Sequence, residues 1–223
     1  MDEDNDAMLA AAYLQDCKWN ETDAVQRIMA YLQSVKVHGS PHISHILPYV
    51  GVDLVTNRPK PCGVLLENLK GGCARDKKGN PIVVIYGAFE CDGDNAIKQM
   101  NFLMHRVRRY IASTELPFVT YVFDSAPRAG LHSMDVPVIS FIRHMSNFPQ
   151  SFRMIVCGAP AAMVSAWNIG KAVLPRQTVE RTEFCQSYDI LKEYIDTDNM
   201  LQSWGGTFSF SISDYMQHLF DSC

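Results

Sequence analysis

The sequence has no run of apolar residues long enough to span a bilayer, and its acidic first residues lack the pattern of a secretory signal peptide. It also lacks the excess of Lys and Arg that a nucleic-acid surface needs, since its net charge is -4, and it contains no RNA- or DNA-binding motif. These absences predict a cytoplasmic protein without a nucleic-acid partner. With 223 residues, 47% of them hydrophobic, the chain is long enough to bury the core of one domain with a small helical appendage.

The seven cysteines are odd in number and include no Cys-x-x-Cys pair, so the sequence predicts neither a disulfide framework nor a zinc knuckle. Reduced thiols agree with a cytoplasmic location. Three histidines have a spacing that could hold a metal, His38, His42 and His45. Pro41 breaks the helix that would align their rings, and bound zinc usually recruits a fuller ligand set. We therefore expect no metal site and no cofactor.

Catalytic motifs are also missing: the sequence has no Gly-x-Ser-x-Gly turn, no Gly-x-Gly-x-x-Gly and no phosphate-binding loop. Asp124, Ser125 and His132 are close in sequence, but the members of a catalytic triad normally come from separate loops. We therefore interpret Asp124 as a turn-capping residue. Cys157 lies within an apolar strand pattern and is interpreted as a small buried hydrophobe. The sequence predicts no catalytic residue and a protein that is not an enzyme.

Residues 8–36 form a helical pattern in which Val25, Ile28, Met29 and Leu32 repeat on one face. Asn20 followed by Asp23 is typical of a helix start. Prolines and glycines then predict a linker over 39–72 with short helical or extended pieces.

Beyond residue 72 the pattern alternates between strands and helices. A turn at 76–79 leads into the first of several β-branched and aromatic runs, which predict strands over 81–86, 118–124 and 154–157 and near 182–185. Helical spacing predicts helices over 96–111, 137–148 and 188–194. The order implies right-handed crossovers and an α/β fold with a mostly parallel sheet flanked by helices. Arg106 belongs to a locally basic middle of the chain, which could meet an anionic membrane surface, with scattered solvated charge as the alternative.

The most informative segment is an unusually apolar helix predicted over 161–174, directly after a buried strand. A helix that is apolar on almost all sides must bury itself in protein, in a membrane or against an apolar ligand. This one is too short to span a bilayer. The pattern favours lipid handling, with ordinary packing in a core as the alternative. Its apolar side chains are Met163, Val164, Trp167, Ile169 and Val173.

Six short motifs in this order and spacing resemble the CRAL-TRIO family of lipid-binding domains, which includes phosphatidylinositol and α-tocopherol transfer proteins. No single motif is specific. They are Arg-Asp-Lys-Lys-Gly-Asn-Pro at 75–81, Val-Phe-Asp at 122–124, Phe-Pro-Gln at 148–150 for the family's Tyr-Pro-Glu, Gly-Ala-Pro at 158–160 for its Asn-Ala-Pro, the segment from Trp at 167–174, and Gly-Gly at 205–206.

The resemblance implies a lipid-binding domain over 61–223, preceded by an N-terminal helical region and linker over 1–60. It further implies a pocket for one lipid, floored by the sheet and closed by a mobile gate helix that also touches the membrane. The helix over 161–174 falls where that gate belongs. The positions that hold an inositol phosphate headgroup in relatives correspond here to Gln150, Thr178 and Arg181, although Gln150 cannot form the ion pair that the family's Glu makes.

Alternate positions of a strand share one face, and on that basis six side chains are expected to line the pocket. An error of one residue in register would move them to the other side of the sheet. They are Val84, Tyr86, Tyr121, Phe123, Ile155 and Cys157.

The leading hypothesis is a non-catalytic protein that carries or presents one lipid between membranes. It would be cytoplasmic and peripheral on membranes, with a phospholipid or another small lipid as partner. An alternative is a protein-interaction or membrane-targeting module of the same fold, with no transfer activity. The third hypothesis is an α/β hydrolase that depends on Ser125 and His132. A protein partner, and further domains in a longer parent chain, stay open.

Overall fold

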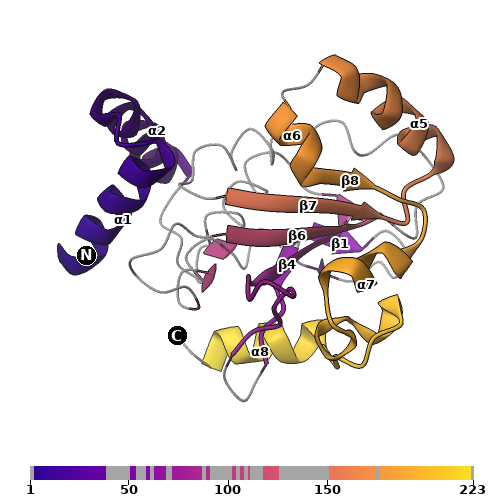
Figure 1. The fold of residues 1–223 in the computed structure, drawn as a ribbon. Coiled ribbons are helices and arrows are strands. Elements are labelled where there is room, and N and C mark those ends of the chain that lie inside the picture. Colours follow the sequence, from indigo (N-terminus) through magenta and orange to yellow (C-terminus); the bar gives the residue numbers. More distant parts are fainter. Residues whose placement is uncertain are drawn as a thin grey trace.

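A five-stranded sheet forms the centre of the computed structural model, with the strand order β3-β4-β6-β7-β8 (Figure 1). The structure describes residues 3–38, 51–53, 59–60, 63–68, 72–86, 89–90, 102–103, 106–107, 110, 118–125, 151–173 and 176–221. The strands of this sheet are β3 (Gly63–Leu65), β4 (Ile82–Tyr86), β6 (Phe118–Asp124), β7 (Ser151–Cys157) and β8 (Thr182–Phe184).

Strands β4, β6, β7 and β8 run parallel, and β3 pairs antiparallel at the β4 edge. Both faces of such a sheet are covered, which explains why β4 is a continuous apolar run and why β6 and β7 are mostly apolar. The predicted mostly parallel α/β sheet is therefore confirmed, and β7 begins three residues earlier than the predicted strand. A second, small sheet has the order β2-β1-β5, from β1 (Gly51–Asp53), β2 (Pro59–Lys60) and β5 (Phe89–Glu90).

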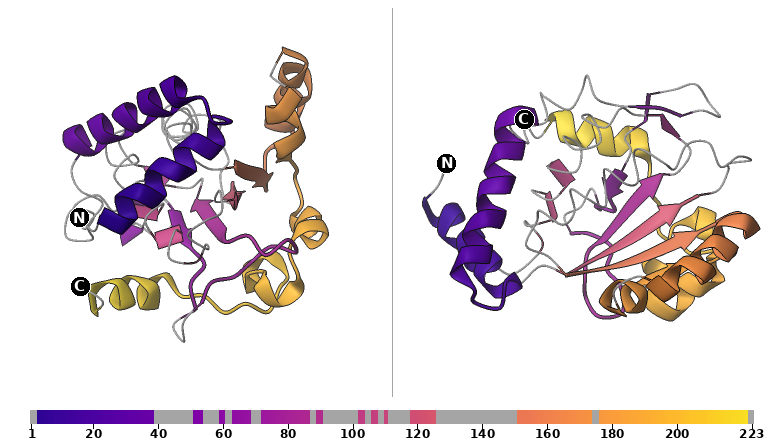
Figure 2. Two further views of the ribbon diagram at one scale, coloured as in Figure 1. Left: turned by 60° about the vertical axis from the view of Figure 1, so that its left-hand side comes forward. Right: turned by 90° about the horizontal axis from the view of Figure 1, so that it is seen from above.

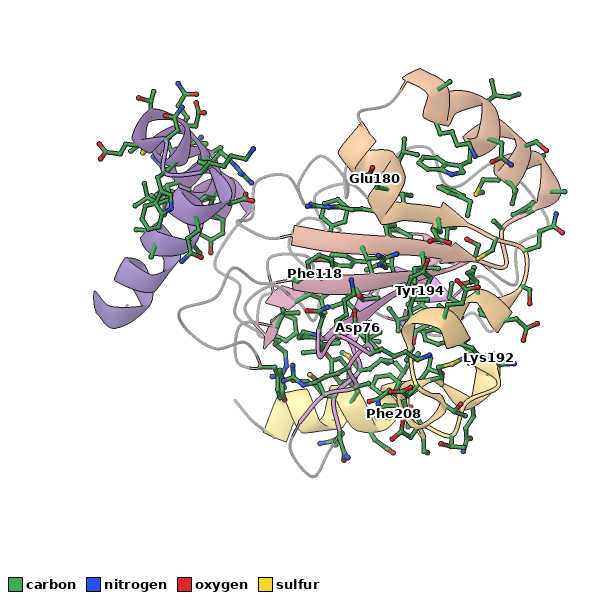
Figure 3. The ribbon with its side chains drawn as sticks, in the orientation of Figure 1. Asp76, Phe118, Glu180, Lys192, Tyr194 and Phe208 are labelled. Carbon is green, nitrogen blue, oxygen red and sulfur yellow. The ribbon has the colours of Figure 1, made fainter. Side chains whose placement is uncertain are left out.

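The turn before β4 is held by Asp76, which is labelled in Figure 3. Asp76 Oδ1 accepts hydrogen bonds from the backbone N–H groups of Lys78 and Asn80, both at 2.9 Å. Its Oδ2 accepts from the Thr120 hydroxyl at 2.8 Å. One buried carboxylate thus shapes the predicted turn and fixes it to β6.

Two helices precede the sheet, α1 (Glu3–Asp16) and α2 (Glu21–His38). The predicted helix start is confirmed, because Asn20 Oδ1 accepts from the Asp23 N–H at 3.3 Å while Asn20 Nδ2 donates to Asp23 Oδ2 at 2.9 Å. Lys18 and Trp19 form the turn between the helices, with φ of 51° and 66°.

Three of the four residues of the stripe predicted on α2 face outward, and only Ile28 packs against the core. Val25, Met29 and Leu32 are 57%, 60% and 47% exposed. The buried side of the helix carries Ala24 and Tyr31, seven residues apart, because α1 packs there and places the Tyr13 ring 6.4 Å from that of Tyr31. The packing of Tyr31 against Tyr13, rather than the longer aliphatic stripe, therefore determines which side of α2 is buried.

The helices cover the two faces of the sheet (Figure 2). The α5-side face is formed by Val83, Ile85, Tyr121, Phe123, Met154 and Val156, and packs against α1, α2, Leu103 and Val107. The opposite, α7-side face is formed by Val64, Ile82, Val84, Val122, Ile155 and Cys157. Leu191, Ile195, Met200, Trp204 and Tyr215 cover this second face.

The remaining helices follow β7 and β8 in the chain. The predicted helix over 188–194 is present as a 3-10 turn followed by α7, whereas the predicted helix over 137–148 lies outside the described residues. Among the described residues, no helix combines the length and apolar character needed to cross a membrane. The elements are α5 (Ala161–Gly170), α6 (Arg176–Arg181), α7 (Leu191–Tyr194) and α8 (Ile212–Asp221), with 3-10 turns at Lys171–Val173, Tyr188–Ile190, Thr197–Asn199 and Gln202–Trp204.

Arg106 is buried, which corrects both alternatives for this base, contact with an anionic membrane surface and solvated charge. Its guanidinium binds the carboxylate of Glu67 through three hydrogen bonds of 2.8 to 3.0 Å, and the two side chains are 8% and 2% exposed. Burial alone would lower the pKa of Arg106, but the hydrogen bonds and charge of Glu67 raise it above its ordinary value. The pair joins the loop after β3 to the helical segment that contains Val107.

Candidate functional site

Helix α5 begins immediately after the carboxyl end of β7. Gly158 turns the chain with φ +66°, a left-handed conformation that favours glycine, and Pro160 precedes the first helical residue. The chain returns through α6 to the neighbouring strand β8. We call residues 158–173 and 176–181 the gate segment. Figure 1 shows α5 beside the β8 edge of the sheet, at the margin of the molecule.

None of the ten residues of α5 is buried, although the helix is strongly apolar. Met163 and Val164 are half-buried against the α5-side cluster. The indole of Trp167 stacks on Phe184 of β8, with ring centroids 4.8 Å apart and planes 25° apart. Ile169 is 78% exposed. The helix therefore retains apolar surface that could still be removed from water, at about 25 cal/mol per Å².

The gate residues predicted from the sequence thus lie on one helix but in different environments. Met163, Val164 and Trp167 face the sheet, whereas Ile169 points to solvent. The side chain of Val173 lies outside the described residues. The described part of α5 and the 3-10 turn after it agree with the predicted helix over 161–174.

The six predicted pocket residues do not share one face, so their grouping was wrong. The parallel register pairs Val84 with Val122 and Val122 with Ile155, so these side chains lie on the α7-side face. Cys157 belongs to the same cluster, and Tyr86 packs against it. Only Tyr121 and Phe123 belong to the α5-side face.

The residues missed on the α5-side face are Val83, Ile85, Met154 and Val156. Sequence alternation could not separate Val83 from Val84, because β4 is apolar on both faces. In β6 and β7 the polar residues Thr120, Asp124 and Arg153 all share the α7-side parity, and this signal could have identified Met154 and Val156 as residues of the other face. For β4 the faces are separated only by its pairing register with β6, which is a property of the folded sheet.

Asp124 is a tertiary anchor rather than the turn cap that the sequence suggested. Its carboxylate accepts hydrogen bonds from the Tyr188 hydroxyl and, at 3.1 Å, from Trp204 Nε1. These bonds tie the carboxyl end of β6 to the segments that cover the α7-side face. Burial, followed by the charge of Asp124, raises the pKa of Tyr86 well above its ordinary range.

The residues of the hypothetical triad do not form one in the part of the chain that the structure describes. Ser125 is buried, and its backbone N–H donates to the carbonyl of Cys157 at 2.9 Å. His132 lies outside the described residues. The same holds for His42 and His45, and no group of three or more His, Cys, Asp or Glu among the described residues could hold a metal ion.

The predicted headgroup residues are only partly described. Gln150 lies outside the described residues, as does the side chain of Thr178, whose backbone belongs to α6. Arg181 ends α6, is half-exposed, and takes part in none of the ion pairs between described residues. The next residue, Thr182, has a buried hydroxyl without a hydrogen-bond partner. Its Cα pairs with that of Met154, which places this hydroxyl on the α5-side face.

Residues 70–206 match the model of the CRAL/TRIO domain. This match covers more than half of the chain, and the protein therefore belongs to the CRAL-TRIO family, as the motifs predicted. Members of this family generally bind or transfer small lipids and are generally not catalysts.

One curated relative is the CRAL-TRIO domain-containing protein C3H8.02 of Schizosaccharomyces pombe (strain 972 / ATCC 24843), with 26% identity over 137 residues. The match covers 59% of this chain and 31% of the relative, so the chain spans about a third of that protein's length. The fold is similar to that in the crystal structure of Sfh5, with a TM-score of 0.57 and 12% identity, over 99% of this chain and 82% of that one.

Proposed function

We propose that this protein binds one lipid between the α5-side face of its sheet and the gate segment, and carries or presents that lipid between membranes without catalysis. The observation that carries the proposal is α5, a strongly apolar helix with no buried residue, resting on the sheet edge through Trp167. Family membership supports the class of ligand.

The proposed mechanism is an exchange of apolar burial. Complete burial of a large apolar side chain contributes roughly 1.5 to 3 kcal/mol. Each buried CH₂ of an acyl chain contributes about 0.8 kcal/mol, so about three CH₂ groups equal one such side chain. The half-buried Met163 and Val164 can therefore be covered by a bound lipid when the gate is closed, or by bilayer when it is open. Either state removes their apolar surface from water, so the lipid need not cross water.

The proposed polar end of the ligand lies near Arg181. Its guanidinium presents a planar set of donors suited to a phosphate, and it forms no ion pair with another described residue. Gln150 and Thr178 remain proposed contributors to this headgroup site. A phospholipid is the corresponding ligand class, and the proposed place of action is the cytoplasmic surface of a membrane.

Organic extraction of the purified chain followed by mass spectrometry tests the proposal. We expect lipid near one molecule per protein, or uptake of lipid when the delipidated protein is incubated with mixed phospholipid vesicles. A protein that is empty after purification and takes up no lipid from vesicles would refute carriage.

A second candidate is a protein-interaction or membrane-targeting module with no transfer activity. The outward stripe of Val25, Met29 and Leu32 on α2 favours it, because exposed apolar side chains gather there without a partner on the described chain. Binding to vesicles without any lipid uptake would support this candidate over the first.

A further inference from the structure

Two cysteines lie side by side at the carboxyl edge of the sheet. Cys157 ends β7 and Cys185 directly follows β8, and their sulfur atoms are 3.8 Å apart. The strand register pairs Val156 with Phe184, so the next two residues face each other. Neighbouring strands are about 4.8 Å apart, which falls within the Cα separation that a disulfide spans.

Backbone hydrogen bonds hold the two cysteines in this position. The Cys185 N–H donates to the carbonyl of Val156 at 2.9 Å, and the Ala159 N–H donates to the carbonyl of Cys185 at 3.1 Å. The pair is therefore built into the ladder between β7 and β8. To form a disulfide, the sulfur atoms must move from 3.8 Å to about 2.0 Å apart.

The two thiols differ in accessibility and acidity. Cys157 is fully buried, whereas Cys185 is partly exposed. Its hydrogen bond with Cys157 lowers the pKa of Cys185, while that bond and then burial raise the pKa of Cys157 well above its ordinary range. The Cys185 thiol also donates to the carbonyl of Val156 at 3.3 Å, and burial and then the charge of Glu183 oppose the lowering of its pKa. Cys185 is thus the better nucleophile of the two.

The pair also brackets the gate segment, which leaves the sheet after Cys157 and returns to it before Cys185. A covalent bond between the sulfur atoms would close a loop that contains α5 and α6. Such a bond would limit how far β8 can separate from β7, where Phe184 supports Trp167.

We propose that Cys185 and Cys157 form a site of thiol modification that reacts with small disulfides, with Cys185 as the entry thiol and Cys157 as the resolving thiol. With glutathione disulfide, the Cys185 thiolate forms a bond to one glutathione sulfur, the glutathione S–S bond breaks, and one glutathione leaves and takes up a proton. The Cys157 sulfur then attacks that of Cys185, loses its proton, and displaces the second glutathione. Two protein thiols are oxidised by two electrons while one glutathione disulfide is reduced to two thiols.

The test uses the full chain treated with glutathione disulfide at pH 8 and digested with trypsin without reduction. Cleavage yields peptides 154–171 and 182–192, each with a single cysteine. We expect peptide 182–192 to carry glutathione first. A cross-linked pair, lighter by two hydrogen atoms than the sum of the two peptides, should then replace it. This wild-type measurement needs no variant to fold.

Variants and an internal control assign the roles. Cys157→Ser should accumulate glutathione on peptide 182–192 without the cross-link, and Cys185→Ser should show neither product. Burial raises the pKa of Cys73 to about 11, so its peptide is the internal control and should react at least tenfold more slowly than that of Cys185.

The proposal is overturned if Cys185 reacts no faster than Cys73, or if glutathionylated Cys185 never yields the cross-link. It is equally overturned if Cys157→Ser fails to accumulate the mixed disulfide. These readouts are covalent masses, so they stand or fail independently of lipid binding.

Discussion

Replacing Trp167 by Asp tests whether α5 inserts into membranes, and the structure indicates that the fold should survive the change. The indole is half-buried, and among the described residues Phe184 is the only aromatic ring on which it stacks. Such a stack contributes about 0.5 to 1.5 kcal/mol beyond its area. That is small beside the roughly 5 to 15 kcal/mol that stabilises a typical domain.

The same substitution should act strongly on the membrane step. The exposed part of the Trp167 indole, on the order of 70 Å², contributes about 1.8 kcal/mol when a bilayer covers it, at about 25 cal/mol per Å². This free energy corresponds to roughly 20-fold in the partition constant, before the added cost of desolvating the Asp carboxylate. We therefore expect vesicle association, and transfer that depends on it, to fall by about this factor.

The assay compares wild-type protein with Trp167→Asp by vesicle co-sedimentation and by transfer of pyrene-labelled phosphatidylcholine between vesicles, with urea unfolding as the check on the fold. Trp19→Asp is the matched control. Trp19 is 67% exposed, and its positive φ of 66° is a conformation in which Asp is well tolerated. Wild-type behaviour of Trp167→Asp, or an equal loss in Trp19→Asp, would refute the role of α5.

Three further predictions follow from buried or charged groups. Arg106→Met should lower the free energy of unfolding, measured in urea, by about 3 to 5 kcal/mol, because it leaves the Glu67 carboxylate buried and unpaired. A Glu67→Leu/Arg106→Met double variant should recover most of that loss, and an equal loss in both variants would contradict the reasoning. Arg181→Ala should reduce the preference for anionic over neutral phospholipid by about tenfold in competitive uptake, since a hydrogen bond to a charged group contributes about 1.5 to 3 kcal/mol, and equal loss for both lipids would count against a headgroup role. The rate of Cys73 alkylation should continue to rise up to pH 11, because burial raises the pKa of Cys73 to about 11. At pH 8 Cys73 should have about 100-fold less thiolate than an ordinary thiol of pKa 9, and an alkylation rate that levels off near pH 9 would contradict this. The sign for stability follows from the same shift: the folded protein holds this proton more tightly than the unfolded chain, so ionisation of Cys73 favours unfolding as the pH rises from about 9 to 11.

The features predicted correctly are those that a few neighbouring residues determine. The start of α2 depends on the reciprocal hydrogen bonds of Asn20 and Asp23, three positions apart. Strand β4 and most of β6 and β7 are apolar, and the spacing of the strands leaves room for crossover helices, which makes a parallel sheet the natural arrangement. The apolar helix α5 and the motifs around it indicated the family for the same local reason.

The features that were missed depend on partners far away in the sequence. Arg106 was assigned to solvent because its partner, Glu67, lies 39 positions earlier, and no feature of the neighbouring sequence indicates that pairing. The outward stripe on α2 could be interpreted only after Tyr31 was seen against Tyr13. Cys157 and Cys185 are 28 residues apart, and no Cys-x-x-Cys spacing marks their proximity.

The sequence by itself determined the class of fold, the family and the presence of an apolar helix whose surface must be buried. The reason is that periodicity, capping and motif order depend only on residues that are close together in the chain. Only the tertiary structure decided which side of the sheet faces α5. Strand β4 is buried and apolar on both faces, so its sequence does not distinguish Val83 from Val84. The pairing of β4 with β6 and of β6 with β7 determines the face on which each side chain lies.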